Sequence, residues 1–151
     1  MKKKLLIVFD ESVGDDYKDS FEKPATCKVI LTTRKRRITG RKRFDDPEIF
    51  KMGQYKYPIA TRDCVMTGDS HKPYKKAGKI ILRQPDKSKG ENIEAYKLKI
   101  TKFLIQQKDK SNIFHNNIAL IPVIKPIIIM RWNDFIKRFP TKERIYAYEK
   151  S

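Results

Sequence analysis

Acidic residues follow two apolar, strand-like runs of this strongly basic chain. Asp10 and Glu11 come directly after "LLIVF", and Asp63 closes the run "YPIATRD". The carboxyl ends of parallel strands meet at one edge of a sheet, and α/β proteins bind their ligands there. We therefore expect these acids to converge at one edge, joined by Asp46 from the start of an intervening helix.

A group of neighbouring carboxylates needs either a cation or strongly shifted pKa values, because like charges repel. Carboxylate oxygens are hard ligands, which Mg²⁺ and Mn²⁺ prefer. Such a metal activates water and stabilises displacement at a phosphodiester, so the acids outline a metal-dependent nuclease. The spacing alone also allows a purely structural interpretation, in which Asp10 and Asp46 cap helices and Asp63 belongs to a turn.

A dense basic run lies between these acids. In "RKRRITGRKR", residues 34–43, seven of ten positions are Arg or Lys. The run is either a solvated loop or a loop that contacts phosphates beside an active site, and arginine's planar fork suits phosphate. The expected nucleic-acid-binding residues are Arg34, Lys35, Arg36, Arg37, Arg41, Lys42, Arg43 and Arg62.

The overall charge favours a polyanionic partner. The 151 residues include 35 Lys and Arg against 18 Asp and Glu, which gives a formal net charge of +17. Nucleic acid is the first expectation, because phosphate neutralisation releases counterions, and an anionic membrane surface is the second. The most apolar segment, residues 118–130, is too short to span a bilayer and contains Lys125 and two prolines. We expect a cytoplasmic protein without a membrane segment.

Strand and helix patterns alternate along the chain, which favours an α/β fold with a mainly parallel sheet in a single domain, residues 1–151. Residues 91–108 give the clearest helix, with one apolar stripe at Ile93, Tyr96, Ile100, Phe103 and Leu104. A short helix followed by a strand is expected in the tail, 133–151. The other predicted elements are strands at 4–9, 27–33, 57–63 and 78–85, helices at 12–23 (Ser12 as N-cap) and 45–54, and an edge pair at 117–124 and 126–132 with Pro126 in the connection.

Several motifs together resemble small PIN-like domains, the toxin-related ribonucleases. "LLIVFDESV" resembles their first strand, which ends in an Asp followed by Glu or Asn. "DDPEIF" is similar to their second signature, an Asp followed two positions later by an acid at a helix start. "PIATRD" is similar to the third, a strand ending in Thr-Arg-Asp or Thr-Asn-Asp. "GKIILR" and "PIIIMR" look like the strands that follow, so the resemblance covers residues 4–131 in the family's order.

The resemblance implies a three-layer α/β/α sandwich and cleavage of RNA that depends on Mg²⁺ or Mn²⁺. It implies that Asp10, Asp46 and Asp63 form the catalytic, metal-binding site, with Glu11 and Glu48 as secondary ligands. RNA is the expected partner ahead of DNA. An antitoxin-like protein partner and a homodimer are further expectations from the resemblance alone.

The chain departs from this family pattern at one position. Relatives often carry another Asp two positions after the acid of the third strand, where this chain has Val65. Three alternatives stay open: a site with fewer acids, a site that recruits Asp69, or a site that has lost its chemistry. In the last case the chain is a nucleic-acid-binding module, alone or within a larger complex.

Overall fold

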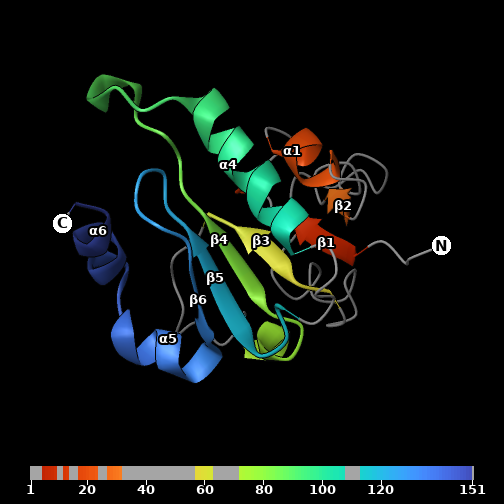
Figure 1. The fold of residues 1–151 in the computed structure, drawn as a ribbon. Helices are drawn as coiled ribbons and strands as arrows, with labels where there is room; N and C mark the ends of the chain where they lie inside the picture. Colours follow the sequence, from red (N-terminus) through yellow and green to blue (C-terminus); the bar gives the residue numbers. More distant parts are fainter. Residues whose placement is uncertain are drawn as a thin grey trace, which may run out of the picture.

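A six-stranded mixed sheet forms the centre of the molecule (Figure 1). The computed structural model describes residues 5–9, 12–13, 17–23, 27–31, 57–62, 72–107 and 113–150. The strand order is β2-β1-β3-β4-β5-β6. The first five strands in this order, β1 included, are parallel, and β6 is antiparallel to β5 at one edge. The strands are β1 (Leu5–Phe9), β2 (Cys27–Leu31), β3 (Ile59–Thr61), β4 (Lys79–Leu82), β5 (Asn117–Ile121) and β6 (Ile128–Arg131).

The strands form where the sequence has short apolar runs. Every residue of β3 and of β4 is buried, as expected for central parallel strands that are covered on both faces. Alternate side chains of β4 enter different cores: Ile80 and Leu82 face one side, and Ile81 the other. The parallel pairing of five of the six strands confirms the prediction of a mainly parallel sheet. Pro126 lies in the connection between β5 and β6, as predicted.

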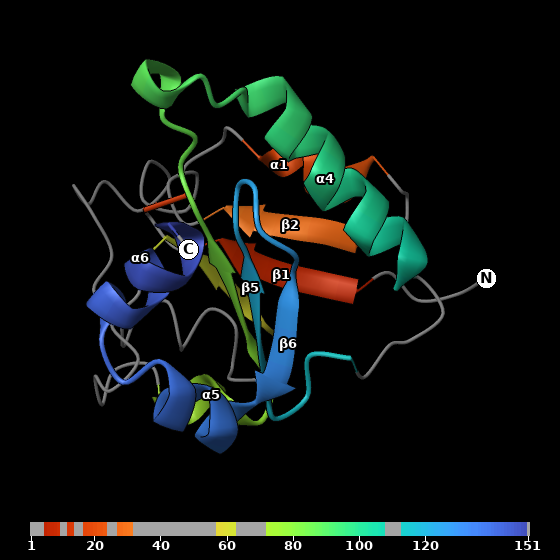
Figure 2. The same ribbon diagram turned by 60° about the vertical axis from the view of Figure 1, so that its left-hand side comes forward.

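Helices cover both faces of this sheet (Figure 2). On one face, α1 (Lys18–Glu22) packs against α4 (Ile93–Gln106), and both contribute to the first core. On the other face, the second core includes Tyr74 from the 3₁₀ helix η1 (Lys72–Lys75) and side chains of α5 (Trp132–Arg138) and α6 (Lys142–Lys150). A second 3₁₀ helix, η2 (Lys87–Lys89), lies between β4 and α4.

The predicted amphipathic helix is confirmed in α4. Tyr96, Ile100, Phe103 and Leu104 are buried in the first core, and Ile93 packs against it. The helix begins after Asn92, whose side-chain oxygen accepts hydrogen bonds from the backbone N–H groups of residues 94 and 95. Its apolar stripe therefore fixes α4 across the sheet.

Two local predictions are wrong. The tail forms two helices, α5 and α6, where we expected a helix and then a strand; Trp132, Phe135 and Ile145 bury their side chains in the second core. Ser12 does not begin a helix either: α1 begins only at Lys18, and its N-cap has no side-chain hydrogen bond. The predicted helix at 45–54 lies outside the described residues.

Candidate functional site

The candidate site is the edge of the sheet where the five parallel strands have their carboxyl ends. Next to Phe9, the last residue of β1, lies Ala60 of β3, and Val8 pairs with Ile59. The chain runs from β1 outward to β2 and then crosses to β3 on the opposite side of β1. This reversal makes the ends of β1 and β3 a topological switch point, the usual place for a ligand in an open α/β sheet.

Most of the site residues predicted from sequence lie outside the described residues. They are the acids Asp10, Glu11, Asp46, Glu48, Asp63 and Asp69 and the basic residues Arg34, Lys35, Arg36, Arg37, Arg41, Lys42 and Arg43. Their roles stay predictions. In the sequence, Asp10 follows the last residue of β1, and Asp63 comes two residues after the end of β3.

Arg62 is the predicted site residue that the structure does describe, and it lies at the switch point. Its backbone N–H donates to Ser12 Oγ at 3.0 Å, and the Ser12 and Thr61 hydroxyl oxygens are 3.2 Å apart. Thr61 is completely buried. These contacts join the segment after β1 to the end of β3. The Ser12 side chain therefore links two segments and does not cap a helix as predicted.

The Arg62 side chain is held against an aromatic ring. Its guanidinium carbon lies 5.3 Å from the ring centroid of Tyr17, which is fully buried beside α4. The electron-rich face of the ring attracts the guanidinium charge, which restricts the positions that the Arg62 side chain adopts. Such an arrangement suits the predicted phosphate contact.

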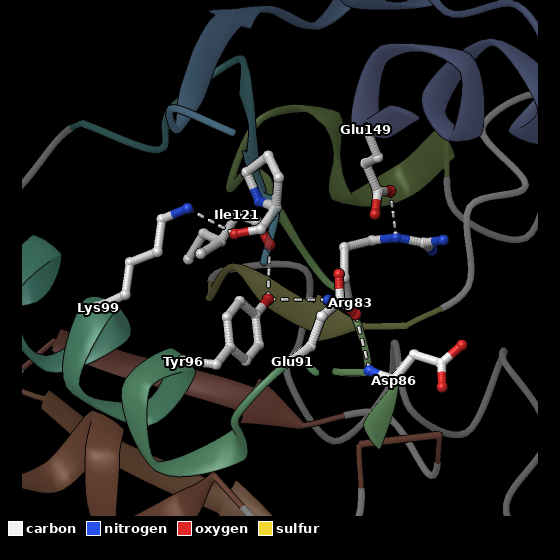
Figure 3. A network of polar contacts seen from close by, with 8 residues as sticks. Arg83, Asp86, Glu91, Tyr96, Lys99, Ile121 and Glu149 are labelled. Carbon is white, nitrogen blue, oxygen red and sulfur yellow. Dashed lines mark hydrogen bonds and ion pairs between the residues drawn. The ribbon is translucent and has the colours of Figure 1, made fainter. Parts of the chain in front are cut away.

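A second polar group lies at the same edge, beyond β4 and β5 (Figure 3). The Tyr96 hydroxyl accepts from the Arg83 backbone N–H at 2.8 Å and donates to the Ile121 carbonyl at 2.5 Å. Burial raises the pKa of Tyr96 above its ordinary value of 10.0, so the hydroxyl keeps its proton at neutral pH and into alkaline solution. It thus connects the ends of two neighbouring strands through a helix side chain.

Arg83 also joins the edge of the sheet to α6. Its Nε donates to Glu149 Oε1 at 2.6 Å, and its guanidinium carbon lies 4.8 Å from the ring centroid of Tyr146. Burial raises the pKa of Glu149, and the Arg83 charge acts in the opposite direction. Nearby, the Asp86 backbone N–H donates to Glu91 Oε1 at 2.7 Å, which shapes the start of the η2 loop (Figure 3).

Lys99 stabilises the connection between β5 and β6. Its ammonium group donates to the carbonyls of Pro122 and Lys125, each at 2.6 Å. Burial lowers the pKa of Lys99. Sequence reasoning missed this role and those of Tyr96 and Arg83; the only signal for Arg83 was its place at the end of an apolar run, while Tyr96 looked like an ordinary core residue.

Within the described ranges, no three His, Cys, Asp or Glu side chains lie close enough to hold a metal ion. The same part of the chain contains no helix that is both long and apolar enough to cross a membrane. No protein-family profile, curated protein or solved structure matches the chain.

Proposed function

We propose that this protein is a metal-dependent endoribonuclease with a PIN-like three-layer fold. The observation that carries the proposal is the pairing of β1 with β3, which makes the carboxyl ends of these two strands a switch point. In the sequence, two of the predicted acids come shortly after these ends. Asp10 continues the chain from β1, and Asp63 follows β3 after Arg62. Helices on both faces of a mainly parallel sheet support the proposed fold class.

The donor set fits the proposed metal. Asp10, Asp46 and Asp63 offer only hard carboxylate oxygens, with Glu11, Glu48 and Asp69 as secondary candidates, and this chemistry suits Mg²⁺ or Mn²⁺. A bound ion of this kind supplies activated water and charge stabilisation at a phosphodiester. In this proposal the chain's own contribution would be to bring the three acids from separate segments together at one edge of the sheet.

Basic residues would hold the RNA backbone at this edge. Arg62 is stacked on Tyr17 and has its backbone anchored by Ser12, so its position is constrained before any ligand arrives. The Arg- and Lys-rich run 34–43 would add phosphate contacts, whose affinity falls as salt rises. These contacts position RNA without reading its sequence.

The test is cleavage of a labelled single-stranded RNA and of its DNA counterpart, with Mn²⁺, with Mg²⁺ and with a chelator. We expect metal-dependent cuts in RNA that disappear in Asp63→Ala. Asp134→Ala is the matched control, because Asp134 is an exposed acid on α5. Cleavage that survives in purified Asp63→Ala would refute the proposed site.

A second candidate is a nucleic-acid-binding module without catalysis. Val65, at a position where PIN-like relatives often have an acid, favours it. In this case RNA binds tightly and in a salt-sensitive way but is not cut with either metal. Replacing Asp10 or Asp63 would then leave the affinity unchanged, whereas neutralising residues 34–43 would weaken it.

A further inference from the structure

A stripe of exposed residues runs along α6 beside the carboxyl edge of the sheet. Lys142, Tyr146 and Lys150 are spaced four residues apart, so they share one flank of the helix. Both lysines are exposed, and Tyr146 is 39% exposed although it is a large aromatic residue. Ile145 faces the other way and is completely buried in the second core.

Arg83 fixes the position of this stripe relative to the candidate site. Its guanidinium packs on the Tyr146 ring and pairs with Glu149, one turn further along α6. Arg83 directly follows β4, and β4 pairs with β3, which ends next to Arg62. The flank of α6 that carries Tyr146 therefore lies along the same edge as the switch point.

The chemistry of the stripe fits a nucleic-acid strand. Within the described part of the chain, neither Lys142 nor Lys150 makes an ion pair. Of the two acids of α6, Glu149 is paired with Arg83, and Glu143 is exposed in the first turn. The lysines lie roughly 12 Å apart along the helix axis, from the 1.5 Å rise per residue. A cation at each end with an aromatic ring between them is the combination that binds phosphates and one stacked base.

We propose that the Lys142, Tyr146 and Lys150 stripe, which Arg83 holds in position, binds single-stranded RNA next to the proposed cleavage site. An unpaired base stacks on the face of the Tyr146 ring that Arg83 does not cover, and the lysines contact the flanking phosphates. The stacking requires an unpaired base, which makes single strands and loops the substrate class and disfavours duplexes. The inference rests on the proposed function for its choice of nucleic acid as partner, but it does not depend on the metal site.

The test is equilibrium binding of a fluorescent single-stranded RNA, measured with a chelator present so that cleavage cannot interfere. Removing one base stack should weaken binding about 10-fold in Tyr146→Leu, as expected for a stack of about 1.4 kcal/mol. Tyr146→Phe keeps the ring and should bind like the unchanged protein. Duplex RNA should bind more weakly and should not respond to Tyr146→Leu.

The lysines are tested through the salt dependence of affinity. In Lys142→Gln/Lys150→Gln the slope of log K against log salt should fall by about 1.4, since each lost phosphate contact of a single strand removes about 0.7. The control is Lys102→Gln/Lys137→Gln, which removes the same charge from exposed positions on α4 and α5 and should change the slope less. Circular dichroism and thermal unfolding check that each variant folds.

The outcomes separate the two proposals. If the unchanged protein does not bind RNA, the proposed function fails. If it binds but Tyr146→Leu and Tyr146→Phe bind equally well, the α6 stripe is not the binding surface and this inference fails alone. Loss of cleavage in Asp63→Ala with normal binding, combined with weak binding by Tyr146→Leu, supports both.

Discussion

Arg83 and Glu149 form an ion pair that connects the end of β4 to the last helix of the chain. The Arg83 Nε atom lies 2.6 Å from Glu149 Oε1, and their side chains are only 15% and 22% exposed. The two residues are 66 positions apart in the sequence. This pair and the burial of Ile145 explain why residues after the sheet form a docked helix at the carboxyl edge.

Breaking this pair should destabilise the protein. Arg83→Gln leaves the Glu149 carboxylate partly buried without its cation, so we expect the free energy of unfolding to fall by about 1–3 kcal/mol. The measurement is urea unfolding of Arg83→Gln, Glu149→Gln and the double variant. If the double variant's loss equals the sum of the single losses, the two side chains do not interact in solution.

Tyr96→Phe should also destabilise the protein, because it removes the hydroxyl that serves both Arg83 and Ile121. A buried carbonyl and a partly buried N–H group would lose their partner, at an expected cost of about 1–3 kcal/mol at neutral pH. The matched comparison is Tyr148→Phe, whose hydroxyl makes a more exposed hydrogen bond to the Pro126 carbonyl. Urea unfolding that shows no larger loss for Tyr96→Phe would contradict the bridging role.

The same residue predicts a pH dependence. The pKa of Tyr96 in the folded protein is raised by burial above its ordinary value of 10.0. In alkaline solution the unfolded chain therefore loses this proton first, so the stability that Tyr96 provides is fully present below pH 10.0 and declines as the pH rises further. The unchanged protein should therefore exceed Tyr96→Phe in unfolding free energy by less above pH 10.0 than below it. Unfolding measured on both sides of this pH is the test, and a larger difference above pH 10.0 would refute the prediction.

Ser12→Ala should loosen the backbone between β1 and β3. The Arg62 N–H loses its acceptor, for which we expect about 1 kcal/mol of stability and faster hydrogen exchange at the Arg62 amide. Amide exchange followed by NMR is the direct measurement, with the Arg83 amide as an internal control. Equal exchange at Arg62 in both proteins would show that the Ser12 contact does not form in solution.

Gly78 should tolerate no side chain, unlike Gly90. Gly78 has a φ of +104°, and a Cβ there would lie 1.9 Å from the Phe114 carbonyl oxygen. Gly78→Ala should therefore cost about 3 kcal/mol or more, since both strain and a backbone clash must be relieved. Gly90 has a φ of +76° but open space around it, so Gly90→Ala should cost about 1 kcal/mol. Thermal unfolding of both variants compares these costs.

The sequence by itself determined the strands of the sheet and α4. Central parallel strands are buried on both faces, so they need continuous apolar runs such as "KIIL" in β4, and such runs are visible in any sequence. The stripe of α4 is equally visible because one face of a long helix repeats every three or four residues. The same reasoning predicts Asp10 and Asp63, from the points where apolar runs end.

Only the tertiary structure decided the tail and the contacts at the edge of the sheet. "RIYAY" alternates like a strand, yet it belongs to α6, because burying Ile145 and pairing Glu149 with Arg83 both favour the docked helix. Ser12 looked like a helix cap but instead contacts Thr61, 49 residues away. Such contacts depend on which segments the fold brings together, and local propensity carries no information about partners so distant along the chain.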